Sequence, residues 1–495
     1  MRTTLRLVAV ACLSVILAAY EQPPGSPLKP KPPPPKPAAT EPAAAQAGPD
    51  FTAARDEAVK ILQGLVRIDT SNPPGNETLA AQYLKSILDK EQIDSEILAL
   101  DETRGNLVAR LKGNGAKKPI LLMGHTDVVG VERDKWTVDP FAAEIKDGYI
   151  YGRGASDDKG MTSVALQVFL MLAREKVPLD RDVIFLAEAG EEGTSSVGIQ
   201  YMVAQQWDKI ACEFALNEGG WMLQRDGQVQ YVGVVSTEKV PRGIRLVARG
   251  TSGHGSMPRL DNAIVHLSAA VAKIGAWQPP MRLNETTHTF FKRLAKVSPP
   301  EEAALYDVLD DPAKNQAAED VIRRTSIMYN SMLRTSLSPT IIKGGFRSNV
   351  IPAEAEVTID VRALPDEDME KFVALLKKVI DDPAVEIVTP ARSRVAPQPS
   401  RLDTDMFLAL ERAQAAVFPA AVTLPVMLTG ATDSAPLRAK GVHAYGLGSV
   451  VSEDDRARVH GNDERLSIEG IGKFVELMYR AVKDVAATPP PVAER

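Results

Sequence analysis

The 495-residue sequence predicts an α/β protein in which a mainly parallel sheet lies between helices, with a second α+β domain inserted into it. Two observations support this fold class. Short apolar runs bounded by turn residues alternate with helical stretches, which is typical of buried parallel strands. From about Thr237 the strands become half-polar, as in a sheet with one face in water, and the first pattern returns at about Leu402.

The first pattern defines the elements of the main domain. Apolar residues recur at helical spacing, and the intervening apolar runs are short enough for strands. We expect helices over Ala53–Val66, Thr78–Lys90 and Met161–Arg174, and strands over Ile120–Met123, Val183–Ala187, Phe214–Leu216 and Val442–Leu447.

The second pattern defines the inserted unit. Its strands nearly alternate between apolar and polar residues, and its helices are amphipathic. We expect strands over Gly243–Ala248 and Glu354–Arg362, and helical stretches over Asn262–Ile274, Glu301–Tyr329 and Glu367–Val379.

The first 50 residues predict an exported chain. Arg2 and Arg6 precede the apolar run Leu7–Ala19, which ends in small residues and is too short to span a bilayer, so residues 1–19 read as a signal peptide. Tyr20 stands where a lipoprotein would carry cysteine, which disfavours lipid anchoring but leaves a membrane-tethered form open. Residues 20–50 are rich in Pro and Ala, the composition of a linker.

These patterns predict six segments. We expect a signal peptide (1–19), a linker (20–50), a first catalytic segment (51–236), an inserted domain (237–395), a second catalytic segment (396–486) and a tail (487–495). The mature chain would be secreted or periplasmic. After signal removal only Cys212 remains, so no intrachain disulfide is available.

Composition and motifs exclude several classes of function. A net charge of −6 gives no general attraction to nucleic acid or anionic lipid, and we expect no stable membrane insertion after signal cleavage. The sequence contains neither the G-x-S-x-G of serine hydrolases nor the G-x-x-x-x-G-K of nucleotide enzymes.

Chemically active side chains follow three predicted strands. His125 and Asp127 follow the first of them, Glu191 and Glu192 the second, and Glu218 the third. Ligands of open α/β sheets bind at the carboxyl ends of the strands, so these side chains are expected at one edge of the sheet.

Two further segments add ligand types. Asp157 and Asp158 lie in GRGASDDKG before a helix, where simple helix capping is the alternative, and His460 lies in a loop rich in Gly and Asp. Each signal is weak alone. Imidazole together with carboxylate suits zinc, whereas calcium and magnesium prefer oxygen ligands only.

In these motifs and their order, residues 55–485 resemble the zinc-dependent exopeptidases and deacylases that include aminoacylase, carnosinase, succinyl-diaminopimelate desuccinylase and bacterial glutamate carboxypeptidase. Within this family, the sequence of Asn217–Gly220 and the length of the inserted region resemble the carboxypeptidase S branch most. The resemblance implies a zinc-exopeptidase catalytic domain with an inserted lid and dimerisation domain.

The resemblance also implies residue roles. Glu191 would be the general acid/base, and Asp127 would orient His125. The cofactor would be two Zn²⁺ per chain, with Co²⁺ or Mn²⁺ left open. His125 and Glu218 would hold the first ion, Glu192 and His460 the second, and Asp157 both.

The remaining implied residues concern the substrate. His254, in GTSGHGSMP, would stabilise the oxyanion, commonly in the site of a partner subunit, which implies a possible homodimer; an inconsequential loop histidine is the alternative. Asn349, Arg362 and Thr432 would contact substrate, although Arg362 could instead form a structural salt bridge. Which arginine binds the substrate carboxylate stays open, with Arg392 and Arg394 as further candidates.

The predicted function is metal-dependent hydrolysis of an amide bond next to a C-terminal carboxylate, by a carboxypeptidase or an N-acyl-amino-acid amidohydrolase. Small peptides or N-acyl amino acids would be the substrates. A dipeptidase or aminopeptidase is the alternative, although such relatives tend to carry Asp at the position of Glu218. A non-catalytic periplasmic binding protein is disfavoured by the intact Glu191.

Overall fold

The computed structural model describes residues 48–390 and 396–488. Within them, the largest sheet has ten strands in the order β1-β2-β6-β3-β7-β18-β9-β8-β19, with β17 beside β9. Its central strands β6, β3, β7 and β18 run parallel, which confirms the predicted fold class. The strands are β1 (Ser95–Ala99), β2 (Gly105–Leu111), β3 (Ile120–His125), β6 (Val183–Glu188), β7 (Phe214–Asn217), β8 (Trp221–Arg225), β9 (Gln228–Glu238), β17 (Val422–Leu428), β18 (His443–Gly446) and β19 (Val450–Val451).

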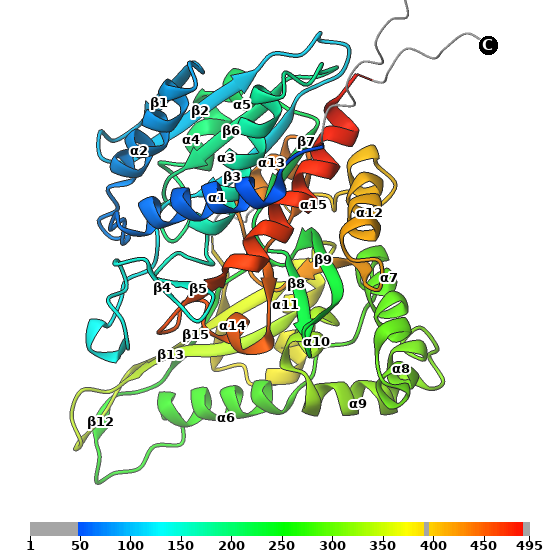
Figure 1. Ribbon diagram of the computed structural model, residues 1–495. Helices are drawn as coiled ribbons and strands as arrows, with labels where there is room; N and C mark the ends of the chain where they lie inside the picture. Colours follow the sequence, from blue (N-terminus) through cyan, green and yellow to red (C-terminus); the bar gives the residue numbers. More distant parts are fainter. Residues whose placement is uncertain (1–47, 391–395, 489–495) are drawn as a thin grey trace, which may run out of the picture. The chain divides into compact units, whose positions relative to one another are not determined.

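Helices cover both faces of this sheet (Figure 1). Strands β3, β6 and β7 are buried along their whole length because apolar helix faces pack on each side. In Figure 1 the blue α1 and the red α15 lie side by side, and both contact α3. One face carries α1 (Phe51–Val66), α2 (Glu77–Lys90), α3 (Lys159–Arg174), α12 (Asp405–Val417) and α15 (Ile468–Ala486); the other carries α4 (Ile199–Gln205), α5 (Trp207–Ile210) and α13 (Ser434–Ala439).

Helix α3 is buried on nearly all sides, as expected for a helix whose apolar residues surround its axis. Its first residue, Lys159, is fully buried and donates a hydrogen bond to the Ile68 carbonyl at 2.8 Å, and burial lowers the pKa of Lys159 to about 7. The Asp158 side chain at the N-cap makes no capping hydrogen bond. Capping therefore does not explain why an aspartate stands there.

A second sheet of five strands is antiparallel and has its own apolar core. Its order is β10-β15-β11-β16, with β13 on the other side of β15. Alternate residues of β15 are buried under helices α6 and α11, as the near-alternating sequence predicts. The elements are β10 (Val240–Pro241), β11 (Ile244–Arg249), α6 (Ala263–Ala276), β13 (Ser336–Gly344), β15 (Glu354–Ala363), α11 (Met369–Ile380) and β16 (Val385–Val388).

The helices between α6 and β13 pack elsewhere. Helix α7 contacts β17 of the large sheet, and Phe290 and Phe291 belong to the apolar core of that sheet. Side chains of the insertion therefore pack in two apolar cores. The limits of the inserted domain, 237–395, stay a prediction. These helices are α7 (Glu285–Leu294), α8 (Pro300–Asp307), α9 (Asn315–Thr325) and α10 (Ile327–Met332).

The chain passes from the large sheet to the second sheet through a buried polar junction. Glu238, the last residue of β9, pairs with Arg438 of α13 at 2.9 Å, and both side chains are buried. The next residue, Lys239, is fully buried and donates hydrogen bonds to Ser331 and Ser336. Loss of one partner of a buried ion pair typically lowers the free energy of unfolding by about 3–5 kcal/mol. The junction therefore stabilises the segment that connects the two sheets.

No helix within the described residues combines the length and the apolar character that a membrane crossing requires. The predicted signal peptide (1–19), residues 20–47 of the linker and residues 489–495 of the tail lie outside the described residues, as do Arg392 and Arg394.

Candidate functional site

His125 ends the buried strand β3 and points a nitrogen at two acidic groups. Its Nε2 atom lies 3.1 Å from Asp157 Oδ1 and 3.9 Å from Glu218 Oε2. Its other ring nitrogen, Nδ1, lies 3.0 Å from the backbone oxygen of Asp127 and 3.4 Å from its carboxylate. The second nitrogen is thus held by Asp127, which leaves Nε2 directed at the acidic groups.

Asp127 is fully buried and connects several parts of the site. Its carboxylate accepts the backbone N–H groups of Glu191 and Glu192 at 3.0 and 3.1 Å. It also accepts a hydrogen bond from the Asn72 amide at 2.8 Å. One carboxylate therefore fixes both the His125 ring and the loop that carries the two glutamates.

His460 meets the opposite side of Asp157. Its Nε2 atom lies 3.1 Å from Asp157 Oδ2 and 2.9 Å from Glu192 Oε1. Asp157 thus stands between His125 and His460, with one carboxylate oxygen toward each ring. This is the arrangement expected of a carboxylate that bridges two metal ions.

Two groups of side chains have ligand atoms within 4.8 Å of one another, His125–Asp157–Glu192 and His125–Asp158–Glu218. The structure thus brings the five predicted metal ligands together. It also adds Asp158, for which the sequence predicted no metal role. Asp158 is buried, and its Oδ2 atom accepts the His125 backbone N–H at 3.3 Å.

The pKa values of these groups are shifted in the directions expected for closely spaced carboxylates with few cations nearby. Burial raises the pKa of Glu218 well above its ordinary value, and the neighbouring Glu191 and Asp157 raise it further. Hydrogen bonds to Asp157 and Glu192 raise the pKa of His460 to about 10. Burial opposes the charged form of His125, but hydrogen bonds to Asp127 and Asp157 raise its pKa as well. Divalent cations would supply the missing charge, and the mixed imidazole and carboxylate donors fit zinc.

Unlike Glu192, Glu191 has no histidine partner at hydrogen-bonding distance among the described residues. Burial raises the pKa of Glu191 to about 8, and the carboxylates of Asp433, Glu192 and Asp157 contribute to the rise. A carboxyl group that changes protonation near neutral pH, beside candidate metal ligands, is suited to move protons.

Sequence reasoning missed Glu464, which shapes the loop before Asp157. Glu464 is fully buried, which its position in a polar loop did not indicate. The only signal was its place four residues after His460. Its carboxylate accepts hydrogen bonds from the Arg153 side chain and from the backbone N–H groups of Gly154, Ser156 and Asp157.

Sequence reasoning also missed a buried carboxyl pair, Glu188 and Asp433. Burial raises the pKa of Glu188 to about 8, and burial together with Glu188 raises that of Asp433 well above its usual range. Glu188 could have been noticed because it ends β6 beside His125 at the end of β3. Asn72, which holds Asp127, carried no comparable signal.

A cavity of about 340 Å³ opens at the cluster. Thr432 lines it, as predicted for a substrate contact, and Glu238 accepts hydrogen bonds from the Thr432 backbone N–H and hydroxyl group at 3.2 and 2.9 Å. The acidic and imidazole groups that line the cavity are Asp157, Asp158, Glu191, Glu192, Glu218 and His460.

The other predicted substrate residues do not line this cavity. His254 lies in β12 (Gly253–His254), which pairs with β14 (Val350–Ile351), and its side chain is exposed and bonded to Ser256. Asn349 lies beside it, since its carbonyl accepts the Gly255 N–H. Arg362 is bonded to Asp360 at 3.0 Å, which matches the salt-bridge alternative.

Human N-fatty-acyl-amino acid synthase/hydrolase PM20D1 is 27% identical, over 88% of this chain and 89% of that protein. The probable carboxypeptidase S-like 2 of Dictyostelium discoideum is 30% identical, over 77% and 74% of the two chains. The M20 family metallo-carboxypeptidase Sso-CP2 from Sulfolobus solfataricus shares the fold with a TM-score of 0.63 at 20% identity, over 86% of this chain and 99% of that one.

The family comparison covers most of the described chain. Residues 121–484 match peptidase family M20/M25/M40, a span that contains all five predicted metal ligands, from His125 to His460. The expected kinship with zinc-dependent exopeptidases and deacylases is thereby confirmed, and so is the expectation of a metallopeptidase or amidohydrolase. This chain is a member of peptidase family M20/M25/M40.

Proposed function

We propose that this protein hydrolyses the amide bond next to a free carboxylate in N-acyl amino acids or small peptides, with two zinc ions held by His125, Asp157, Glu192, Glu218 and His460. The observation that carries this proposal is that Glu191 and four of these groups line one cavity, while the fifth, His125, lies 3.1 Å from Asp157. The names of the relatives, an N-fatty-acyl-amino acid synthase/hydrolase and a carboxypeptidase S-like protein, describe reactions at such bonds.

When bound, the two ions would polarise the amide carbonyl and lower the pKa of a water molecule. Glu191 accepts the proton of the attacking water and returns it to the leaving nitrogen. Asp127 positions Glu191 by accepting its backbone N–H, and positions His125 through the ring nitrogen that faces away from the cluster. Thr432 lies where it can contact bound substrate.

Removal of metal tests the first element of this proposal. We expect about two zinc ions per chain by elemental analysis. Chelation should abolish hydrolysis of N-acyl amino acids, and added Zn²⁺ or Co²⁺ should restore it. Chelation should also lower the melting temperature, because ions bound only by the folded state stabilise it. A preparation free of metal that kept full activity would contradict the proposal.

Substitution of Glu191 separates proton transfer from metal binding. Glu191→Gln should lower kcat by about 10²–10⁴-fold, because the general acid/base is lost, while zinc content stays near normal. His460→Ala is the matched variant, and it should lower zinc content instead. The role assigned to Glu191 is wrong if Glu191→Gln keeps more than about a tenth of wild-type kcat, a value far above the expected range.

We further propose that the second sheet forms a lid and a homodimer interface. Strand β13 pairs only with β15 within the described residues, so its other edge is free to pair with a second copy. Large apolar side chains on this strand, on helix α6 and on the loops beside them are exposed, which supports a surface that a second copy of the chain covers. They are Met257, Leu260, Ile264, Val265, Ile341, Ile342 and Phe346.

Mixing of variants tests whether His254 acts in the site of a partner. His254→Ala should bind zinc and dimerise normally but lose about 10²–10³-fold in kcat, as expected when one oxyanion donor is removed. A mixture of His254→Ala and Glu191→Gln chains should regain activity, because a heterodimer has one site with both residues intact. If subunits exchange, as shown by mass spectrometry of the mixed dimer, and no activity returns, then His254 acts within its own chain or has no catalytic role.

We also propose export of the chain, on the order of basic, apolar and small residues in 1–19. The mature protein should begin near Tyr20 and be recovered outside the cytoplasm. N-terminal sequencing of protein from the fractionated source cells checks this. An intact Met1 on cytoplasmic protein would contradict export.

A further inference from the structure

The cavity at the candidate metal ligands is also lined by apolar side chains, and we call this part of the cavity the chamber. Beyond the acidic groups its walls come from helices α3 and α15 and strands β8 and β19, together with β20 (Arg465–Ser467). These side chains are at most 7% exposed, so a ligand group placed among them would leave water. They are Met161, Trp221, Leu447, Val451, Leu466 and Phe474.

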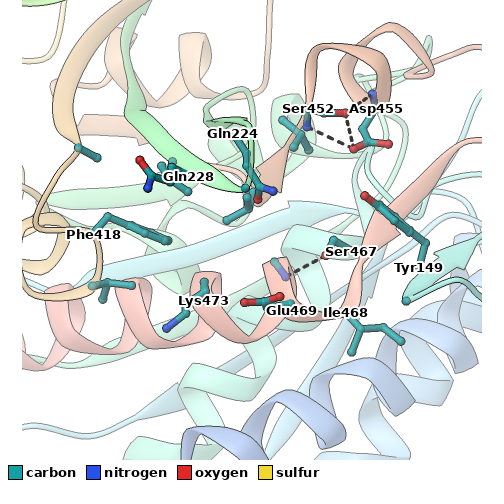
Figure 2. A pocket seen from close by; sticks show the side chains of 18 of the residues that line it. Tyr149, Gln224, Gln228, Phe418, Ser452, Asp455, Ser467, Ile468, Glu469 and Lys473 are labelled. Atoms are coloured by element: carbon teal, nitrogen blue, oxygen red, sulfur yellow. Dashed lines mark hydrogen bonds between the residues drawn. The ribbon is translucent and has the colours of Figure 1, made fainter. Parts of the chain in front are cut away.

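A second and larger cavity of about 770 Å³ shares one lining residue, Val451, with the first. Figure 2 shows it between helix α15, which presents Glu469 and Lys473, and the β8–β9 hairpin, which presents Gln224 and Gln228. Phe418 lies at one end and Tyr149 at the other.

The wall between the two cavities is a single layer of chain. Val450 lines only the second cavity, whereas Val451 lines both. Successive residues of a strand point to opposite faces, which explains this division within β19. In the next strand, β20, Leu466 lines the chamber and Ser467 the second cavity. Val451 is therefore the side chain at which the chamber ends.

Arg456 also lines the chamber, and its positive charge favours an acyl group that carries a negative charge. Arg456 lies 4.1 Å from the centre of the Trp221 ring, and its nearest acidic partner, Glu453, is 3.7 Å away. An acyl group that ends in a carboxylate could pair with Arg456. The apolar side chains outnumber this single cation, and the guanidinium already stacks on Trp221, so the chamber favours an apolar chain.

From this geometry we propose that the chamber binds the acyl chain of the substrate and that Val451 sets the longest chain it accepts. This proposal rests on the proposed amide hydrolysis and specifies its substrates as N-acyl amino acids with an unbranched apolar acyl group. The amide lies at the metal cluster, and the acyl chain extends away from it toward Val451. The amino acid moiety then remains on the side of Thr432 and the lid.

A series of substrates tests this assignment. The N-acetyl, N-butanoyl, N-octanoyl and N-dodecanoyl derivatives of one amino acid differ only in acyl length. In the metal-loaded wild type, kcat/KM should rise by about fourfold per added methylene until the chamber is full, the gain expected from burying a CH₂ group. The N-butanoyl substrate should also exceed N-succinyl, which adds a terminal carboxylate for Arg456.

Variants of the wall sharpen the test. Val451→Phe should lower the ratio of kcat/KM for N-octanoyl to that for N-acetyl, and Val451→Ala should move the optimum to longer chains. Val450→Ala removes the same atoms from the other face of the strand and should keep the wild-type ratio. The two substitutions of Val451 change volume in opposite directions, so a folding defect in one leaves the other as a test.

The outcomes separate this proposal from the proposed function. If the wild type hydrolyses N-acyl amino acids but its chain-length profile is flat, unchanged in the Val451 variants, or highest for N-succinyl, the chamber assignment is wrong. If no amide is hydrolysed, the proposed function fails. Binding of dodecanoate by titration calorimetry still decides the chamber, since Val451→Phe should weaken it and Val450→Ala should not.

Discussion

The site depends on a concentration of negative charge that the fold buries. Asp127, Asp157, Glu191 and Glu218 lie within one cluster, and the only cationic partners at hydrogen-bonding distance from its carboxylates, among the described residues, are the two histidines. Burial without a counter-charge raises the pKa of Glu191 and Glu218 because ionised carboxylates are costly in a dry interior. A protein keeps such a cluster only where something compensates it, and bound dications do so directly.

The parallel sheet explains how this concentration is possible. Strands β3, β6 and β7 end at the same edge, so residues far apart in sequence meet there without any long side chain having to reach. Asp127 then fixes the orientation of these residues, since it holds the His125 ring and the backbone of Glu191 and Glu192. Glu464 does the same for the loop that carries Asp157. The ligands are thus positioned by buried hydrogen bonds from their own backbone.

The second sheet is placed differently. The buried junction at Glu238 and Lys239 holds its connection to the large sheet. Its candidate substrate residues nevertheless stand outside the cavity, with His254 exposed and Arg362 paired to Asp360. A residue of the second sheet that acts on the amide must therefore reach it by lid movement or from a second copy. The chamber, by contrast, is lined by the large sheet, its helices and strand β20.

The amino-acid sequence was sufficient for the fold class and for the buried strands, and it singled out the five candidate metal ligands that the structure brings together. Burial on both faces demands unbroken apolar runs, and metal chemistry demands His, Asp and Glu, so both leave patterns that are local in the chain. Only the tertiary structure placed Asp158 with His125 and Glu218, and only it revealed Asn72 and Glu464 as the groups that hold the ligands. It also decided that α7–α10 pack on the large sheet and that Val451 separates two cavities. Such contacts join residues distant in sequence through side-chain geometry, which no local pattern of residue types records.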